Sequence, residues 1–133
     1  MGDRPSSFIL FDLGISGVAA HSRLVKSDPP ARAVLATVPK ELRLWFNEAV
    51  EPAFAKVWIV PVQGPQIPLN SHGDSFDPRL LIVTLPDDLA AEAVVIGYHI
   101  LSVDGHVVDA QLTFTIKKSA YRHALGLLLR RRR

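Results

Sequence analysis

Five short apolar runs, bounded by proline and glycine, constrain the fold of this chain more than any other feature. They cover residues 41–46, 54–60, 79–85, 93–101 and 110–116. In the first run polar and apolar residues alternate, which places Leu42, Leu44 and Phe46 on one face of a strand. Most of the ten prolines lie between the runs, because proline cannot donate to a central ladder. The pattern predicts an all-β, antiparallel sandwich or barrel.

The composition excludes several classes of metal site and of membrane protein. The chain has no cysteine, which excludes disulfides and thiolate sites for zinc or iron–sulfur clusters. Its single methionine is Met1, so no thioether site for Cu(I) can form. Its 133 residues are 48% hydrophobic, enough for one domain with a real core. No uninterrupted apolar stretch reaches the roughly 18 residues of a membrane-spanning helix.

Charge is divided unequally along the chain. Between residues 21 and 116 there are seven basic and eleven acidic residues, a net charge of −4. From Lys117 onward there are seven basic residues and no acid, a net charge of +7. The high isoelectric point therefore belongs to the tail. The body has no basic face interleaved with aromatic residues, so we do not expect nucleic-acid binding.

Residues 1–20 have the features of a degraded secretory signal peptide. A short segment with Arg4 precedes an apolar stretch at residues 8–18, and small residues end at Ala20. Asp12 interrupts the apolar stretch, and the alternative is an uncleaved extension. We expect removal of residues 1–20, which would make His21 the first residue of a secreted, periplasmic or extracytoplasmic protein.

The basic tail at residues 118–133 combines a short apolar patch with four terminal arginines. The patch, residues 125–129, is too short to cross a bilayer. Contact with an anionic membrane surface is one interpretation. A basic tail with no role is the other.

The segment Asp104-Gly105-His106 interrupts strand-like sequence and has two interpretations. Asp-Gly is a common hairpin signal, which favours a turn. In an extended backbone, however, residues i and i+2 share one face about 6.5 to 7 Å apart, so that Asp104 and His106 can reach one ion. The other histidines, at positions 72, 99 and 123, are expected at the surface or at an edge, without a functional role.

His21 completes a metal site if residues 1–20 are removed. An N-terminal histidine offers its amine and its ring Nδ1, which close a six-membered chelate on a metal. Together with Asp104 and His106 this makes three nitrogens and one oxygen, a set that favours Cu(II) among divalent first-row ions. The amine must lose its proton to bind, so affinity is expected to fall as the pH drops.

Three ordered segments, spanning about 96 residues, resemble the CopC-type periplasmic copper-binding proteins of copper resistance. The first is HSRLVKSDPP from His21, with the family's His-x-x-Leu-x-x-Ser-x-Pro opening. The second is PKELRLWFNEAVEPAF from Pro39, whose strand ends in Phe-Asn-Glu. The third is YHILSVDGHVVDAQLTFTI from Tyr98, with Asp-x-His. Tyr98 stands where the family usually has tryptophan.

The resemblance implies a fold and a set of ligands. The fold is a seven-stranded, Greek-key, immunoglobulin-like β-sandwich or barrel, here residues 21–117. One Cu(II) would be bound through His21, Asp104 and His106. Glu48 matches an acid near that site in some members and is expected to support the ligands rather than to bind the metal.

Binding rather than catalysis is the leading interpretation of function. The protein would hold Cu(II) for copper resistance or homeostasis and deliver it to an inner-membrane copper transporter. We do not expect an enzyme, because the site has no nucleophile–base pair. One alternative is a small oxidative copper enzyme with a histidine brace, although Trp45 and Trp58 lie in strand-like runs more typical of a core than of a sugar platform. The other is a metal-free immunoglobulin-like interaction module.

Overall fold

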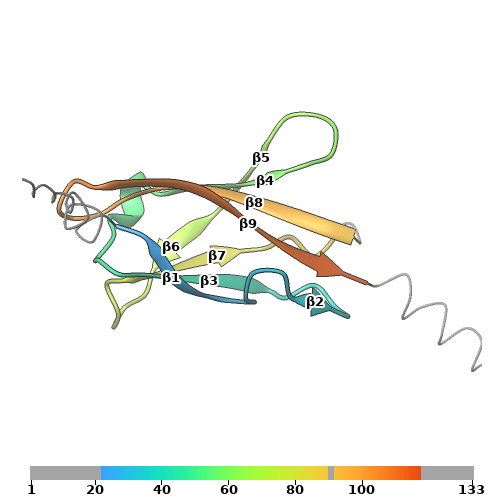
Figure 1. The fold of residues 1–133 in the computed structure, drawn as a ribbon, viewed down its shortest axis with the longest axis horizontal. Helices are drawn as coiled ribbons and strands as arrows, with labels where there is room; N and C mark the ends of the chain where they lie inside the picture. Colours follow the sequence, from blue (N-terminus) through green and yellow to red (C-terminus); the bar gives the residue numbers. More distant parts are fainter. Residues whose placement is uncertain (1–21, 90–91, 118–133) are drawn as a thin grey trace, which may run out of the picture.

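Two β-sheets pack face to face, with their side chains filling the space between them (Figure 1). The structure is a computed structural model and describes residues 22–89 and 92–117. In strand order, the first sheet consists of β1 (Leu24–Asp28), β3 (Glu41–Phe46), β7 (Leu80–Thr84) and β6 (Ser71–Gly73). The second consists of β2 (Val34–Leu35), β9 (Val107–Ile116), β8 (Glu92–Leu101), β4 (Lys56–Val60) and β5 (Ile67–Leu69). The predicted all-β sandwich is confirmed.

Strands are more numerous than the seven expected. The described residues form nine, of which β2, β5 and β6 have only two or three residues each. β5 and β6 lie between residues 62 and 78, a segment that falls between two of the predicted runs. Pro68 lies inside β5, and it is tolerated because β5 is an edge strand that pairs only with β4. A short 3-10 helix, η2 (Pro52–Phe54), precedes β4.

The core lies between the sheets and follows the predicted alternation. Leu42, Leu44 and Phe46 are 0%, 0% and 1% exposed, as expected for one inward face of β3. Phe46 meets Tyr98 of β8 edge to face, with ring centroids 6.0 Å apart and an interplanar angle of 73°. Burial raises the pKa of Tyr98, so its phenol remains neutral in this core.

The two tryptophans are not part of this core, contrary to the sequence interpretation. Both are only half-buried. The Nζ of Lys26 lies 4.2 Å from the ring centroid of Trp45. Trp58 of β4 pairs with Gly97 of β8, and its indole ring lies against the glycine. The residues on either side of each tryptophan are buried: Leu44 and Phe46 beside Trp45, and Val57 and Ile59 beside Trp58. The period of two along a strand therefore puts both indoles on outer faces.

Gly97 leaves the space that the Trp58 indole occupies, which makes a direct test of this packing possible. A Cβ at position 97 would come within 2.5 Å of two indole atoms, so the ring must move. We expect Gly97→Ala to lower the free energy of unfolding by about 1–3 kcal/mol, as overpacking does. Urea unfolding measures this loss. In the Trp58→Ala background the same substitution should cost much less, and an equal cost in both backgrounds would contradict the assignment.

The chain direction brings two distant segments to one end of the sandwich. The start of β1 and the turn between β8 and β9 lie at the same end (Figure 1). The end of β9, followed by Lys117, lies at the opposite end (Figure 1). The first described residues, Ser22 and Arg23, here called the N-terminal arm, therefore lie at the same end of the sandwich as the predicted Asp-x-His segment.

Among the described residues, no helix has the length and apolar character needed to cross a bilayer.

Candidate metal centre

The turn between β8 and β9 carries the Asp104-Gly105-His106 segment. The strands pair up to Leu101 and Val107, and residues 102–106 form the connection. Ser102 N–H donates to His106 O at 2.8 Å, and Gly105 N–H donates to Ser102 O at 2.9 Å. Gly105 has φ +90°, which glycine adopts without strain. The turn interpretation is correct, and the extended-strand argument for Asp104 and His106 is wrong.

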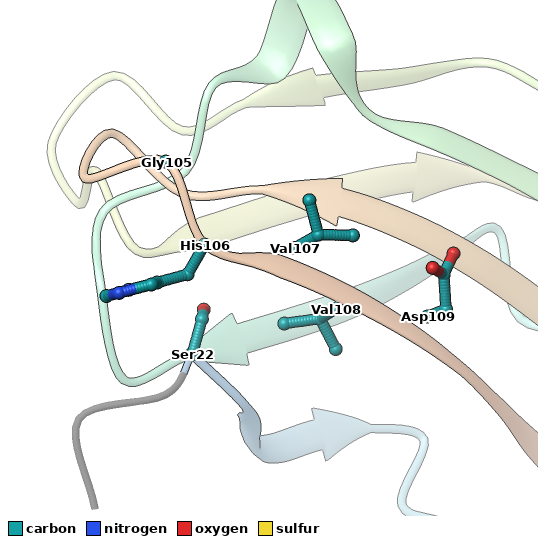
Figure 2. Close-up of a pocket in the computed structure, with 6 residues that line it drawn as sticks. All are labelled: Ser22, Gly105, His106, Val107, Val108 and Asp109. Carbon is teal, nitrogen blue, oxygen red and sulfur yellow. The ribbon is translucent and has the colours of Figure 1, made fainter. Parts of the chain in front are cut away.

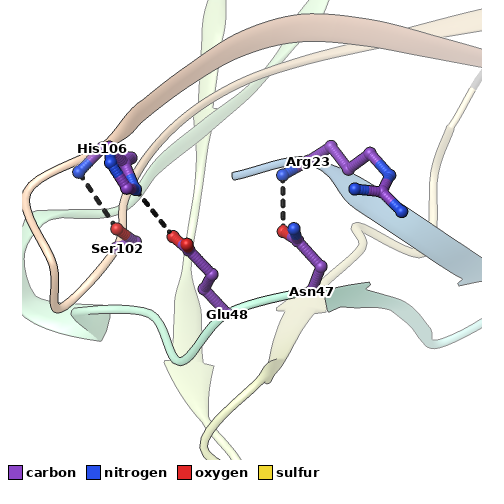
Figure 3. A network of polar contacts seen from close by, with 5 residues as sticks. All are labelled: Arg23, Asn47, Glu48, Ser102 and His106. Atoms are coloured by element: carbon purple, nitrogen blue, oxygen red, sulfur yellow. Dashed lines mark hydrogen bonds and ion pairs between the residues drawn. The ribbon is translucent and has the colours of Figure 1, made fainter. Parts of the chain in front are cut away.

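His106 is held in this turn by contacts to its backbone and to its ring. Its N–H donates to Ser102 Oγ at 3.0 Å, which fixes the main chain. Its ring Nδ1 lies 3.0 Å from Glu48 Oε1, although the two residues are 58 positions apart in the sequence. Figure 3 shows both contacts. A carboxylate on Nδ1 sets the ring orientation and makes Nε2 the nitrogen through which a metal would be bound.

Glu48 is brought to His106 by the segment that follows β3. Val50 forms an isolated antiparallel bridge with Ser102, and Val103 N–H donates to Ala49 O at 3.0 Å. These bonds attach residues 49–50 to the turn and leave the Glu48 side chain only 19% exposed beside the imidazole. The acid that the resemblance places near the ligands therefore contacts one of the predicted ligands directly.

A pocket of about 500 Å³ opens beside His106 and is also lined by Ser22. Ser22 is 8% exposed, and its buried Oγ has no hydrogen-bond partner among the described residues. Figure 2 shows this hydroxyl directed toward the segment that carries His106, whereas Asp109 lies farther along β9. Ser22 follows the predicted ligand His21 in the sequence, so the pocket is lined by the neighbour of one predicted ligand and by another predicted ligand, His106. A buried polar atom without a partner is typical of a site that a polar or ionic ligand completes.

The N-terminal arm is tied to the segment that carries Glu48. Asn47 Oδ1 accepts a hydrogen bond of 2.7 Å from Arg23 N–H, and Asn47 N–H donates to Arg23 O at 3.0 Å. Figure 3 shows the side-chain bond next to the contact between Glu48 and His106. Asn47 and Glu48 are consecutive, so one dipeptide touches both the arm and the turn. Sequence spacing gives no signal for the contact between Asn47 and Arg23, because the two residues are 24 positions apart.

Two of the three predicted ligands lie in the described part of the chain. Asp104 is exposed in the turn, and the imidazole of His106 is partly exposed beside the pocket. His21, the leader at 1–20 and the basic tail at 118–133 lie outside the described residues. Within the described ranges no three histidine, aspartate or glutamate side chains converge as a metal site. A complete site at this turn therefore needs a donor from elsewhere, and His21 is the predicted one.

The other described histidines are at the surface or near it, as expected. His72 is exposed on β6, which pairs only with β7. His99 on β8 contacts its cross-strand partner Asp109 through Nδ1. This pair lies on the outer face of the second sheet.

Comparison with known proteins decides the family. Residues 24–117 match the CopC domain. This chain belongs to the CopC family. The match covers almost the whole described sandwich, and the predicted membership of the CopC-type copper resistance family is confirmed.

Relatives of this CopC domain include two bacterial proteins, the second of them much longer than this chain, and solved structures. Protein YobA of Escherichia coli is 33% identical over 101 residues, which cover 75% of this chain and 82% of YobA. Copper transport protein CutJ of Bacillus subtilis is 27% identical over 101 residues, which cover 75% of this chain and 19% of CutJ. The crystal structure of CopC from Methylosinus trichosporium has a TM-score of 0.66 and 34% identity, covering 72% of this chain and 93% of that one. PcoC of E. coli, described as a methionine-rich copper resistance protein, shares the fold with a TM-score of 0.58 and 24% identity, covering 74% of this chain and 100% of that one.

Proposed function

We propose that this protein binds one Cu(II) ion outside the cytoplasm and serves copper resistance or homeostasis. It holds the ion and delivers it to a transporter of the inner membrane. Membership of the CopC family and the similarity to a copper transport protein support this proposal. The role is that of a carrier rather than an enzyme.

The observation that carries the proposal is the position of His106. Its Nδ1 is held by Glu48, and its pocket is shared with Ser22, the neighbour of His21. We infer that the leader is removed after Ala20, that the new amine and the ring of His21 bind the ion, and that His106 Nε2 and Asp104 complete the set. Three nitrogens and one oxygen suit the tetragonal preference of Cu(II). The carboxylate of Asp104 is exposed in the turn that carries His106.

Titration with a Cu(II) salt tests the proposal. The chain that begins at His21 and ends at Arg133 is expected to bind one equivalent tightly, with an electron paramagnetic resonance spectrum that shows coupling to nitrogen. The affinity should fall with decreasing pH, because the amine and the imidazoles must be deprotonated to bind. An affinity no greater than that of an unfolded peptide containing histidine would instead favour the metal-free interaction module.

A further inference from the structure

We propose that Asn47 is a positioning residue that sets the N-terminal arm against the histidine turn, so that His21 and His106 meet on one copper ion. This inference rests on the proposed copper function. Asn47 does not bind the metal in this account. It acts through Arg23, the second residue after His21.

Two hydrogen bonds attach Asn47 to Arg23. The side-chain Oδ1 of Asn47 accepts from Arg23 N–H at 2.7 Å, and the backbone N–H of Asn47 donates to Arg23 O at 3.0 Å. Only the side-chain bond depends on the identity of the residue, because any residue at position 47 keeps its backbone N–H. Arg23 lies at the surface, where its N–H would otherwise be satisfied by water. The side chain of Asn47 therefore gives Arg23 N–H a fixed acceptor in place of an exchanging water molecule.

Arg23 lies a short distance along the chain from the predicted ligand His21. Ser22 alone separates Arg23 from His21, and one extended residue spans about 3.3–3.6 Å. Ser22 is itself buried against the pocket of His106. Ser22 and Arg23 are thus held in place before any ion is bound, which lowers the entropy that this part of the chain loses on binding.

Asn47 is also connected to His106, the predicted ligand in the turn. Asn47 is bonded to Glu48, and Glu48 holds the ring of His106. Consecutive Cα atoms lie about 3.8 Å apart, so the two contacts share one rigid peptide. The dipeptide after β3 thus sets the spacing between the arm and the imidazole. Figure 3 shows the two contacts side by side on this segment.

The test compares Asn47→Ala with Asn47→Asp in the full chain that begins at His21. Asn47→Ala removes the acceptor for Arg23 N–H and is expected to weaken Cu(II) binding by about tenfold or more, the cost typical of losing a group that orients a ligand. Asn47→Asp keeps an acceptor oxygen and should bind within about twofold of the parent. Asn70→Ala, at the only other asparagine, is the matched control and should change nothing.

A second form of the same chain, in which the His21 amine is acetylated, separates positioning from a general structural effect. There the amine no longer binds the ion, so Asn47→Ala should cause little further loss of affinity. Hydrogen exchange of the Arg23 amide without copper should quicken in Asn47→Ala and stay slow in Asn47→Asp. If Asn47→Ala lowered the Cu(II) affinity equally in the chains with a free and a blocked His21 amine, the positioning role would be overturned. Parent-like affinity of Asn47→Ala in the free chain would overturn it too. Failure of the parent to bind Cu(II) would overturn the proposed function itself. The hydrogen-exchange rates would still show whether Asn47 holds the Arg23 amide.

Discussion

Replacing His106 with alanine is expected to weaken Cu(II) binding by more than about 100-fold. Loss of a partner that only orients a ligand costs about 10–100-fold in metal affinity, so loss of the ligand should cost more. The substitution also leaves the Glu48 carboxylate, which is 19% exposed, without the imidazole it contacts. Competition with a chelator of known Cu(II) affinity measures the change.

The control for this prediction is His72→Ala. His72 is exposed on β6, and it lines neither the pocket of His106 nor the turn. Its removal should leave the affinity within about twofold of the parent. Equal losses of Cu(II) affinity in His106→Ala and His72→Ala would mean that copper binds nonspecifically to surface imidazoles.

Replacing Phe46 with alanine is expected to cause the largest loss of stability, about 3–5 kcal/mol, as for other buried phenylalanines. Phe46 is 1% exposed and packs edge to face on Tyr98. The loss is a large part of the roughly 5–15 kcal/mol that stabilises a domain. Phe46 also precedes Asn47, so the metal-binding segment should loosen together with the core. Urea unfolding followed by circular dichroism measures the loss in the metal-free protein.

Phe54→Ala is the matched control, because Phe54 lies in η2 and is 61% exposed. It should change the free energy of unfolding by no more than about 0.5 kcal/mol, the usual range for surface substitutions. A cost below about 1 kcal/mol for Phe46→Ala would show that this ring does not anchor the core as described.

The long strands are the part of the fold that sequence alone predicts well. The alternation in β3 is visible because one face is buried and the other is wet, and the observed strand has the predicted bounds. β7 is shorter than its predicted run by one residue at each end, and β8 begins one residue before its predicted run. β5 and β6 are short edge strands, and in such strands packing against a neighbour outweighs local propensity. Because they contain proline and glycine, their sequence pattern is that of a loop.

The candidate site is less predictable from local pattern. Asp-Gly indicates both a turn and a strand interruption, and only the hydrogen bonds of Ser102 with Gly105 and His106 decide for the turn. The proximity of Glu48 to His106 followed from family resemblance, since no periodicity relates positions so far apart. The two hydrogen bonds between Asn47 and Arg23 form because β1 pairs with β3. This pairing is a property of the folded sandwich and leaves no local pattern in the sequence.

The central claim is that a freed N-terminal residue and a distant hairpin turn hold one cupric ion together. The most direct measurement is the Cu(II) dissociation constant of the chain that begins at His21, set against that of the same chain with its His21 amine acetylated. Because acetylation removes the chelating amine, the account predicts a loss of affinity of about 100-fold or more in the acetylated chain, above the cost of losing an orienting group. Equal dissociation constants would contradict it.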